Sequence, residues 1–296
     1  MTTTAADPAA DTPTAAPAQK AARRARLSWR GWLGLTMIAV CLILSILAPW
    51  IAPFDPNQSD LFSLRAAPSL TSGHLLGTDD LGRDILSRIC YGARPVMLVA
   101  VCATAISVVL GALLGIAAGA GSPLVDLVIS RLADIQMTIP GLVLALLALS
   151  LFGSRLENLI LILAIESWPL HFRVARGYMQ NARTQGYMEA AWLAGVPGWK
   201  SVWRHVVPGL VPLLSVTATI SASVIVMTEA GLSFIGLGIQ PPTADWGLMI
   251  SQGKAQLGAA WWLSIFPALA LIVLLVGIQL LGDAFSQKYS TGKEAQ

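Results

Sequence analysis

Two glutamates interrupt apolar stretches of the sequence. Glu166 lies in LAIESWPL and Glu229 lies in VIVMTEAGLSF. An ionisable group inside a membrane is costly and often functional. We expect Glu229 to reach water near the outer end of its helix and Glu166 to lie deeper. Each residue has two interpretations: a role on a translocation path or external gate, or a structural bond to a helix-end amide or an arginine.

The sequence contains no recognisable set of residues for catalysis or metal binding. The three histidines are far apart, no His-Glu-x-x-His motif occurs, and the three cysteines lack the spacing of a zinc site or a disulfide framework. GVPGWKS approaches a phosphate-binding loop, but Ala194 and Trp199 occupy its two glycine positions. Ser, His and Asp are all present, yet nothing marks a nucleophile. We therefore predict no metal, no cofactor and no enzymatic activity in this chain.

The composition predicts a membrane protein. Of 296 residues, 55% are hydrophobic and 12% are charged, against about 25% charged residues in soluble domains. The net charge of +3 is too small to indicate a nucleic-acid partner. Apolar runs of about 20 residues are long enough to cross a bilayer as helices. We expect an all-α, polytopic membrane fold whose six transmembrane helices cover residues 32–52, 94–118, 128–151, 156–175, 207–230 and 260–282.

The distribution of basic residues predicts the orientation of these helices. Arginines precede the first apolar run, which is longer than the roughly 7–15 apolar residues of a cleaved signal peptide. Residues 173–206 contain five basic side chains and one acid, whereas the only charged residues of 231–259 are Asp245 and Lys254. Because cytoplasmic loops are enriched in Lys and Arg, we place residues 173–206 and both termini in the cytoplasm.

This orientation divides the chain into four parts. Residues 1–30 are expected to form a disordered cytoplasmic tail, because their Ala, Thr, Pro and Asp cannot build a core. Residues 31–93 hold the first transmembrane helix and an external loop. Residues 94–285 form a five-helix core with a cytoplasmic loop at 176–206, and residues 286–296 form a cytoplasmic C-terminal tail.

Three glycines at four-residue intervals share one face of the second expected helix. They are Gly111, Gly115 and Gly119 in GALLGIAAGAG. Missing side chains allow two helix backbones to approach closely. The stripe predicts either a contact with another subunit or packing within the same chain.

The cytoplasmic loop contains EAAWLAGVPGWKSVWRHVVP. It follows Pro169, which we expect to break the end of the fourth span. Residues 181–194 suit a short helix with Thr184 as its N-cap, and Gly195 suits the left-handed residue that ends a helix. A second short helix is expected before the fifth span. A smooth, alanine-rich helix suits docking in a cleft of another protein, although its tryptophans also suit a position at the lipid headgroups.

Three motifs resemble those of known transport proteins. The spacing of Glu-Ala-Ala, Gly195 and His-Val-Val-Pro is similar to the EAA loop of ABC importer permeases, although His205 departs from its most general form. LLGTDDLGRDILSRICYGAR resembles the external segment of dipeptide/oligopeptide/nickel permeases, and TEAGLSFIGLGIQPPTADWGLMI resembles the segment between their last two helices. The order of the three motifs within residues 30–285 is similar to that of the second permease subunit type.

The resemblance implies a six-helix permease subunit of a type I ABC importer in a bacterial inner membrane. The implied partners are a different permease subunit that forms a heterodimer, two cytoplasmic ATPases that bind ATP and Mg, an extracytoplasmic peptide-binding protein and the lipid bilayer. The implied substrates are di- or oligopeptides, with nickel, glutathione or another small solute as alternatives. An ion-coupled secondary transporter is the alternative of another class.

The same resemblance assigns residues to the coupling of transport to ATP hydrolysis. These residues are Glu189, Ala190, Ala191, Gly195, His205 and Pro208. For His205, a partner contact, a helix cap and an interfacial side chain all stay open.

The external motif comprises Gly77, Thr78, Asp79, Gly82, Arg83 and Asp84. Its glycines permit turns, its first aspartates can accept hydrogen bonds from backbone amides, and Arg83 can pair with Asp84. We favour ordering of the loop over direct contact with substrate.

Overall fold

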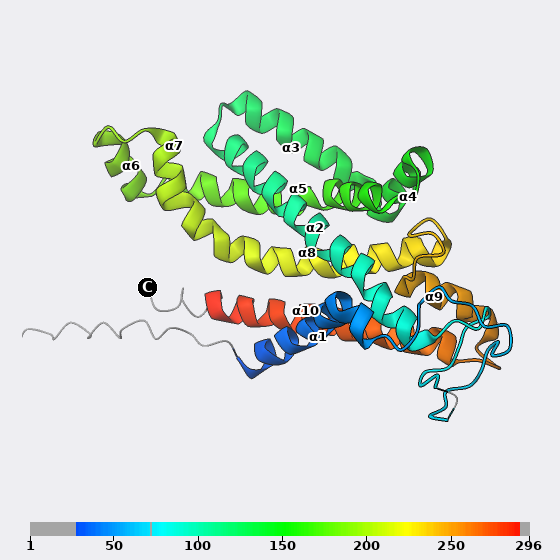
Figure 1. The fold of residues 1–296 in the computed structure, drawn as a ribbon. Coiled ribbons are helices and arrows are strands. Elements are labelled where there is room, and N and C mark those ends of the chain that lie inside the picture. Colours follow the sequence, from blue (N-terminus) through cyan, green and yellow to red (C-terminus); the bar gives the residue numbers. More distant parts are fainter. Residues whose placement is uncertain (1–27, 72, 291–296) are drawn as a thin grey trace, which may run out of the picture.

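The computed structural model describes residues 28–71 and 73–290. Over these residues the chain is helical, with no strand beyond an isolated bridge between Thr78 and Asp84. The long helices pack lengthwise into one elongated bundle (Figure 1). The expected all-α fold is confirmed, while most of the predicted N-terminal tail and residues 291–296 of the C-terminal tail lie outside the described residues.

Ten α-helices follow one another along the described part of the chain. Their bounds are α1 (Trp29–Ile51), α2 (Ile85–Ala120), α3 (Pro123–Thr138), α4 (Gly141–Phe152), α5 (Leu156–Arg183), α6 (Gly186–Leu193), α7 (Gly198–Ser201), α8 (Val207–Ile235), α9 (Trp246–Gly253) and α10 (Trp262–Ser290). A π-helical turn, Val202–Val206, joins α7 to α8, and a 3-10 turn, Lys254–Gln256, follows α9.

Four helical stretches in the described residues are long and apolar enough to cross a membrane. They are α1, α2, the continuous stretch Gly198–Ile235 that contains α7 and α8, and α10. A fifth span results if α3 and α4, which are bent by 91°, are taken as one broken helix. The remaining expected span, α5, has 28 residues but carries Glu157, Glu166 and several arginines. Its length suits a span, whereas its composition alone does not mark it as one.

The third expected span is wrong as a single helix. α3 ends at Thr138 and α4 begins at Gly141, with Ile139 and Pro140 between them. Proline cannot donate a backbone hydrogen bond and disfavours the helical conformation of the residue before it. Ile139 is accordingly extended, with ψ 126°. The apolar run therefore forms a bent pair of helices.

The expected break at Pro169 does not occur, because α5 continues past it to Arg183. Proline lacks the N–H that would bond to the carbonyl four residues earlier. Gln136 of α3 supplies the missing donor: its Nε2 lies 2.7 Å from the carbonyl oxygen of Ile165. A side chain from a distant helix thus satisfies the carbonyl that the proline leaves free.

A second proline is accommodated in the same way. Pro49 lies inside α1 and leaves the carbonyl of Ser45 without its helical donor. The Nε of Arg94 donates to that carbonyl at 2.7 Å. α2 begins at Ile85, so Arg94 lies within this helix and not at the external helix end where the span prediction placed it.

The glycine stripe of α2 packs against α5 of the same chain. A Cβ added at Gly111 would lie 2.6 Å from the Cβ of His171, and one added at Gly115 would lie 2.6 Å from the Cβ of Ala175. Gly119 meets Met179 in the same manner. The structure therefore supports the second interpretation of this stripe, packing within one chain.

The connecting segments gather at opposite ends of the bundle (Figure 1). We call residues 184–206, which include α6 and α7, the EAA end. We call residues 52–84 together with residues 236–261, which include α9, the cap end. These two ends hold most of the residues that the sequence singled out.

Candidate functional site

The Glu-Ala-Ala motif lies on α6, which projects from the bundle at the EAA end (Figure 1). Glu189 is exposed in the first turn of this helix, where the helix dipole favours a negative side chain. Ala190 is also exposed, and Ala191 is half-buried. We expected Thr184 to be the N-cap of this helix, but that expectation was wrong. α5 runs on to Arg183, and Thr184 is the C-cap of α5.

Gly195 ends this short helix as expected. Its φ is +72°, in the left-handed region that favours glycine. The N–H of Val196 donates to the carbonyl of Ala191 at 3.0 Å, which closes the helix end. A Cβ at Gly195 would meet no atom within 4 Å. Glycine is therefore required here for its conformation and not for space.

Pro208 follows a π-helical turn inside one continuous helical stretch. The sequence predicted a second short helix and then a separate fifth span, but Gly198–Ile235 runs without a break. Pro208 cannot donate to the carbonyl of Arg204, which disfavours a normal α-helical turn. The N–H of Val207 instead donates to the carbonyl of Val202, one residue further back than in an α-helix. The EAA loop is therefore joined directly to α8.

His205 connects the two halves of the EAA loop. Its ring lies 5.9 Å from the ring of Tyr187 on α6, measured between centroids. Nearby, Met188 packs against a buried cluster that includes Met179 and Val206. These contacts attach α6 to the helices behind it and leave Glu189 free to meet another molecule.

A groove of about 840 Å³ opens beside α6. Trp199 and Trp203 line it together with Glu189, and both indoles are largely exposed, at 70% and 62%. Aromatic side chains are enriched at the centres of protein interfaces, and their rims are polar. The EAA end thus presents a surface suited to a protein partner.

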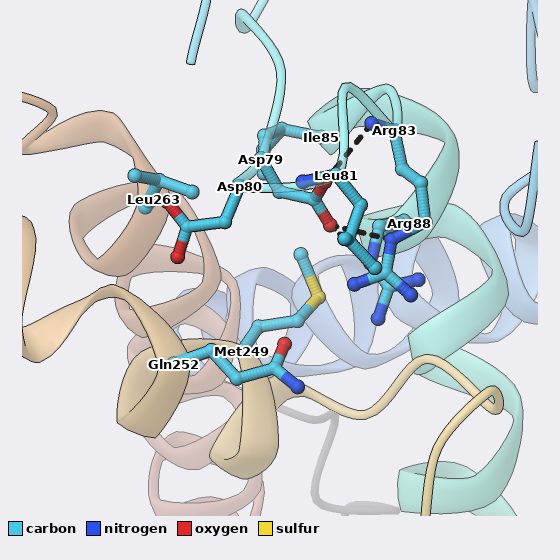
Figure 2. A pocket seen from close by; sticks show the side chains of 9 residues that line it. All are labelled: Asp79, Asp80, Leu81, Arg83, Ile85, Arg88, Met249, Gln252 and Leu263. Carbon is cyan, nitrogen blue, oxygen red and sulfur yellow. Dashed lines mark hydrogen bonds and ion pairs between the residues drawn. The ribbon is translucent and has the colours of Figure 1, made fainter. Parts of the chain in front are cut away.

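At the cap end, Asp79 is the centre of the Gly-Thr-Asp-Asp-Leu-Gly-Arg-Asp motif (Figure 2). Its Oδ1 accepts the N–H groups of Leu81 and Arg83, each at 2.9 Å, and its Oδ2 accepts Arg83 Nε at 2.7 Å. Arg88 points at the same carboxylate, with Nε 3.6 Å from Oδ2. One buried carboxylate therefore forms ion pairs with two buried guanidinium groups.

Arg88 is a residue that the sequence analysis missed. It is 1% exposed and donates from Nη1 to the carbonyl of Pro56 at 3.1 Å. The available signal was an arginine at the start of an apolar helix, since burying such a charge requires a partner. With Asp79, Arg88 ties α2 to the long loop after α1.

Arg83 and Asp84 do not pair with each other, contrary to the expectation. Asp84 instead caps α2, with Oδ2 accepting the Ser87 N–H at 2.8 Å, and its Oδ1 lies 3.0 Å from Nδ1 of His74. Arg83 turns to Asp79. Asp79 and Arg83 lie in the loop before α2, where the turn between them is closed by the Gly82 N–H donating to the carbonyl of Asp79 at 3.0 Å and the Asp79 N–H donating to the carbonyl of Arg83 at 2.9 Å.

The remaining motif residues also order the cap-end loop. Gly77 and Gly82 adopt left-handed φ values of +81° and +74°, which confirms the predicted turns. A Cβ at Gly82 would lie 1.8 Å from the carbonyl oxygen of Asp60. Thr78 accepts the Ala66 N–H at 2.8 Å and is fully buried. The motif is directed inward, which favours its structural interpretation.

Glu229 is fully buried and does not reach water, so this expectation was wrong. The cap-end segment folds back over it, and Asp245 at the start of α9 lies against it. Asp245 was also missed as a functional candidate. It accepts the Leu248 N–H at 2.9 Å as the N-cap of α9. Burial raises the pKa of the Asp245 carboxyl.

Glu166 lies elsewhere, in a cavity of about 290 Å³ at the break between α3 and α4. Its Oε2 accepts the hydroxyl of Ser167 at 3.1 Å, and its other oxygen lies against Gly141 at the start of α4. The two glutamates therefore do not form one site. Among the residues that the structure describes, no group of three His, Cys, Asp or Glu side chains could hold a metal ion.

Comparison with known proteins identifies the class to which this fold and these motifs belong. Residues 111–291 match the family described as binding-protein-dependent transport system inner membrane component. Residues 16–68 match the N-terminal TM domain of oligopeptide transport permease C. The chain belongs to the family of binding-protein-dependent transport system inner membrane components, and the resemblance seen in the sequence is confirmed.

Individual relatives are similar over most of the chain. The Di/tripeptide transport system permease protein DppC of Pseudomonas aeruginosa (strain UCBPP-PA14) is 35% identical over 254 residues, which cover 84% of each chain. The Dipeptide transport system permease protein DppC of Haemophilus influenzae is 35% identical over 85% of this chain and 86% of its own. The Oligopeptide transport system permease protein OppC of the same species is 32% identical over 84% and 80%.

Proposed function

We propose that this chain is a permease subunit of an ATP-driven importer for di- and oligopeptides. The similarity to dipeptide and di/tripeptide permeases over more than four fifths of the chain carries this proposal. In this proposal the protein crosses a bacterial cytoplasmic membrane several times, with both termini and the EAA end in the cytoplasm. A second, different permease completes the translocation path.

The proposed energy source acts at the EAA end. Two cytoplasmic ATPases bind ATP and Mg, and a cleft on one of them receives α6. The exposed Glu189 and the tryptophan-lined groove support this role, because they offer a charged and aromatic surface on a projecting helix. The continuous helical stretch from Gly198 to Ile235 supplies a rigid connection from that surface to the cap end. A peptide-binding protein docks outside the membrane.

The proposed path passes the cavity that Glu166 lines at the break between α3 and α4. Broken helices commonly line transport sites, because their free backbone groups can face a cavity. Glu229 is not part of this path in the proposal, since it is fully buried against Asp245. The first alternative substrates are glutathione and nickel. One relative with 33% identity over 83% of this chain is named a glutathione transport system permease.

Reconstitution of the complete importer tests the function. The chain is purified with its neighbouring permease, ATPases and binding protein, placed in proteoliposomes and assayed for uptake of labelled dipeptides, oligopeptides, glutathione and Ni²⁺. We expect ATP-dependent uptake of peptides that requires the binding protein. Uptake driven by an ion gradient without ATPases would overturn the importer, and transport of Ni²⁺ alone would overturn the peptide assignment.

A further inference from the structure

Two carboxyl groups are buried against each other where α9 packs on α8. Glu229 comes from α8 and Asp245 is the N-cap of α9. Both residues are fully buried, and their carboxyl groups lie close enough to influence each other. Their contact joins the cap-end segment to one of the long apolar helices.

Each carboxyl group has one oxygen with a donor and one without. Oε1 of Glu229 accepts the Ser233 hydroxyl at 3.0 Å, and Oδ1 of Asp245 accepts the Leu248 N–H at 2.9 Å. Oε2 of Glu229 and Oδ2 of Asp245 are buried and have no donor in the described part of the chain. None of the ion pairs found between described residues includes either acid. Each of the two neighbouring carboxyl groups therefore has one buried oxygen without a donor, and no cation among the described residues pairs with either group.

Two ionised carboxylates cannot share such a site without a large cost, because burial and mutual repulsion both oppose the second charge. A retained proton removes the repulsion and also supplies the donor that the two unpaired oxygens lack. We infer that Glu229 and Asp245 hold one proton between them near neutral pH, and that this proton forms the hydrogen bond that joins α9 to α8.

The surroundings assign the proton to Glu229. Asp245 lies at the N-terminus of α9, where the Leu248 N–H and the helix dipole stabilise its ionised form. Glu229 has only the hydroxyl of Ser233. Oε2 of Glu229 is therefore the donor and Oδ2 of Asp245 is the acceptor.

The proton adds to the other contacts that attach α9, which include the Ser251 hydroxyl donating to the carbonyl of Phe234 at 2.6 Å and the Ser264 hydroxyl donating to the carbonyl of Ile250 at 3.0 Å. Trp246 donates from Nε1 to the carbonyl of Ile89 on α2 at 3.0 Å. A Cβ at Gly247 would lie 2.5 Å from the carbonyl oxygen of Ala230, so α9 packs directly on α8 there. Loss of the proton places two negative charges in contact beside these residues. The segment is therefore expected to loosen as the pH rises.

No other titratable group intervenes in this pair. Asp245 is the only titratable group among the described residues that acts on Glu229, and Glu229 is the only one that acts on Asp245. The cation of the same segment, Lys254, lies over the ring of Phe234, 4.8 Å from its centroid. On the α2 side, Arg88 is engaged with Asp79.

Infrared spectroscopy of the full chain in lipid nanodiscs detects the proton directly. A protonated carboxyl group has a carbonyl stretch distinct from that of a carboxylate, and carboxyl-¹³C glutamate shifts it only if the proton is on a glutamate. We expect this band at neutral pH in the wild type and in the control Glu157→Gln, which changes an exposed glutamate. We expect Glu229→Gln to abolish it. Absence of the band, or its persistence in Glu229→Gln, would overturn the inference.

Trypsin cleavage after Lys254 measures the attachment of the cap-end segment, because Lys254 is exposed and is the only trypsin site in residues 231–259. Glu229→Ala leaves Asp245 without its donor, and we expect cleavage roughly tenfold faster than in the wild type. Glu229→Gln keeps a donor that does not titrate, so cleavage should stay near the wild-type rate. Each cleavage rate is divided by the rate for an unfolded peptide substrate at the same pH, which removes the pH dependence of trypsin itself. As the pH rises, the corrected cleavage rate should increase in the wild type and stay constant in Glu229→Gln. Equal pH dependence in both proteins would contradict the inference, and this outcome is independent of which solute the importer carries.

Discussion

The two ends of the bundle use charged residues in opposite ways. At the EAA end, Glu189 is exposed beside open indoles, and nothing in the described chain pairs with it. At the cap end, Asp79 and Arg88 are almost completely buried and form an ion pair with each other, and Asp79 also accepts a hydrogen bond from Arg83. Gly195 at the EAA end and Gly82 at the cap end both have a positive φ, but of these two only Gly82 is also crowded by backbone.

This difference separates residues that order the chain from residues that are free to meet a partner. A buried charge must be paired, and the partners of Asp79 come from the same chain, so its loss mainly affects folding. An exposed charge contributes little to folding and can change binding. The two ends are therefore expected to respond differently to equivalent substitutions.

The largest expected effect is on folding, at the cap end. Asp79→Ala leaves two buried guanidinium groups without their shared carboxylate and should lower the free energy of unfolding by about 3–5 kcal/mol. Asp80→Ala is the matched control, because Asp80 is half exposed and pairs with Arg65 at 3.4 Å. Its cost should be about 0–1 kcal/mol. Thermal unfolding in detergent measures both variants, and equal losses would show that burial does not distinguish these aspartates.

Gly195 and Gly82, one left-handed glycine from each end, provide the second comparison. Gly195→Ala should cost about 1–2 kcal/mol, because only the backbone conformation opposes the side chain. Gly82→Ala should cost clearly more, because its Cβ would also meet the carbonyl of Asp60. The same unfolding measurement compares them. A larger loss in Gly195→Ala would contradict the difference in packing between the two ends.

A third prediction concerns transport. Glu189→Lys should reduce ATP-dependent uptake roughly tenfold, in line with usual coupling free energies, without lowering the amount of folded protein. Glu157→Lys is the control, because Glu157 is also an exposed glutamate in the first turn of a helix. Both variants lose the same favourable interaction with a helix dipole. If uptake falls equally in both, Glu189 has no particular role in coupling.

The smallest expected effect is within the EAA loop itself. A double-mutant cycle of Tyr187→Ala and His205→Ala should give a coupling free energy of about 0.5 kcal/mol, since their rings are in contact at the surface. Unfolding of the four proteins measures it. A coupling near zero in stability together with a coupling in ATPase stimulation would assign His205 to the partner contact and not to the contact with Tyr187.

Much of the candidate site could be predicted from local patterns. The position of the EAA helix, the left-handed Gly195 and the turns at Gly77 and Gly82 depend on a few neighbouring residues. The partner of Arg83 could not be predicted in this way, since two aspartates were within reach and only the turn before α2 brought Arg83 onto Asp79. The contact of Asp245 with Glu229 could not be predicted from local patterns either, because the two residues are 16 positions apart in the chain.

By itself, the sequence determined that this is an all-α membrane protein with an EAA loop between two apolar helices. These properties follow from composition and short-range periodicity, which depend only on residues that are neighbours in the sequence. Only the tertiary structure decided that Gln136 and Arg94 satisfy carbonyls left free by prolines, and that the glycine stripe packs on α5. It also decided that Glu229 is enclosed with Asp245 and not open to water. The physical reason is that a buried polar group must find its partner in space, and that partner can lie anywhere along the chain.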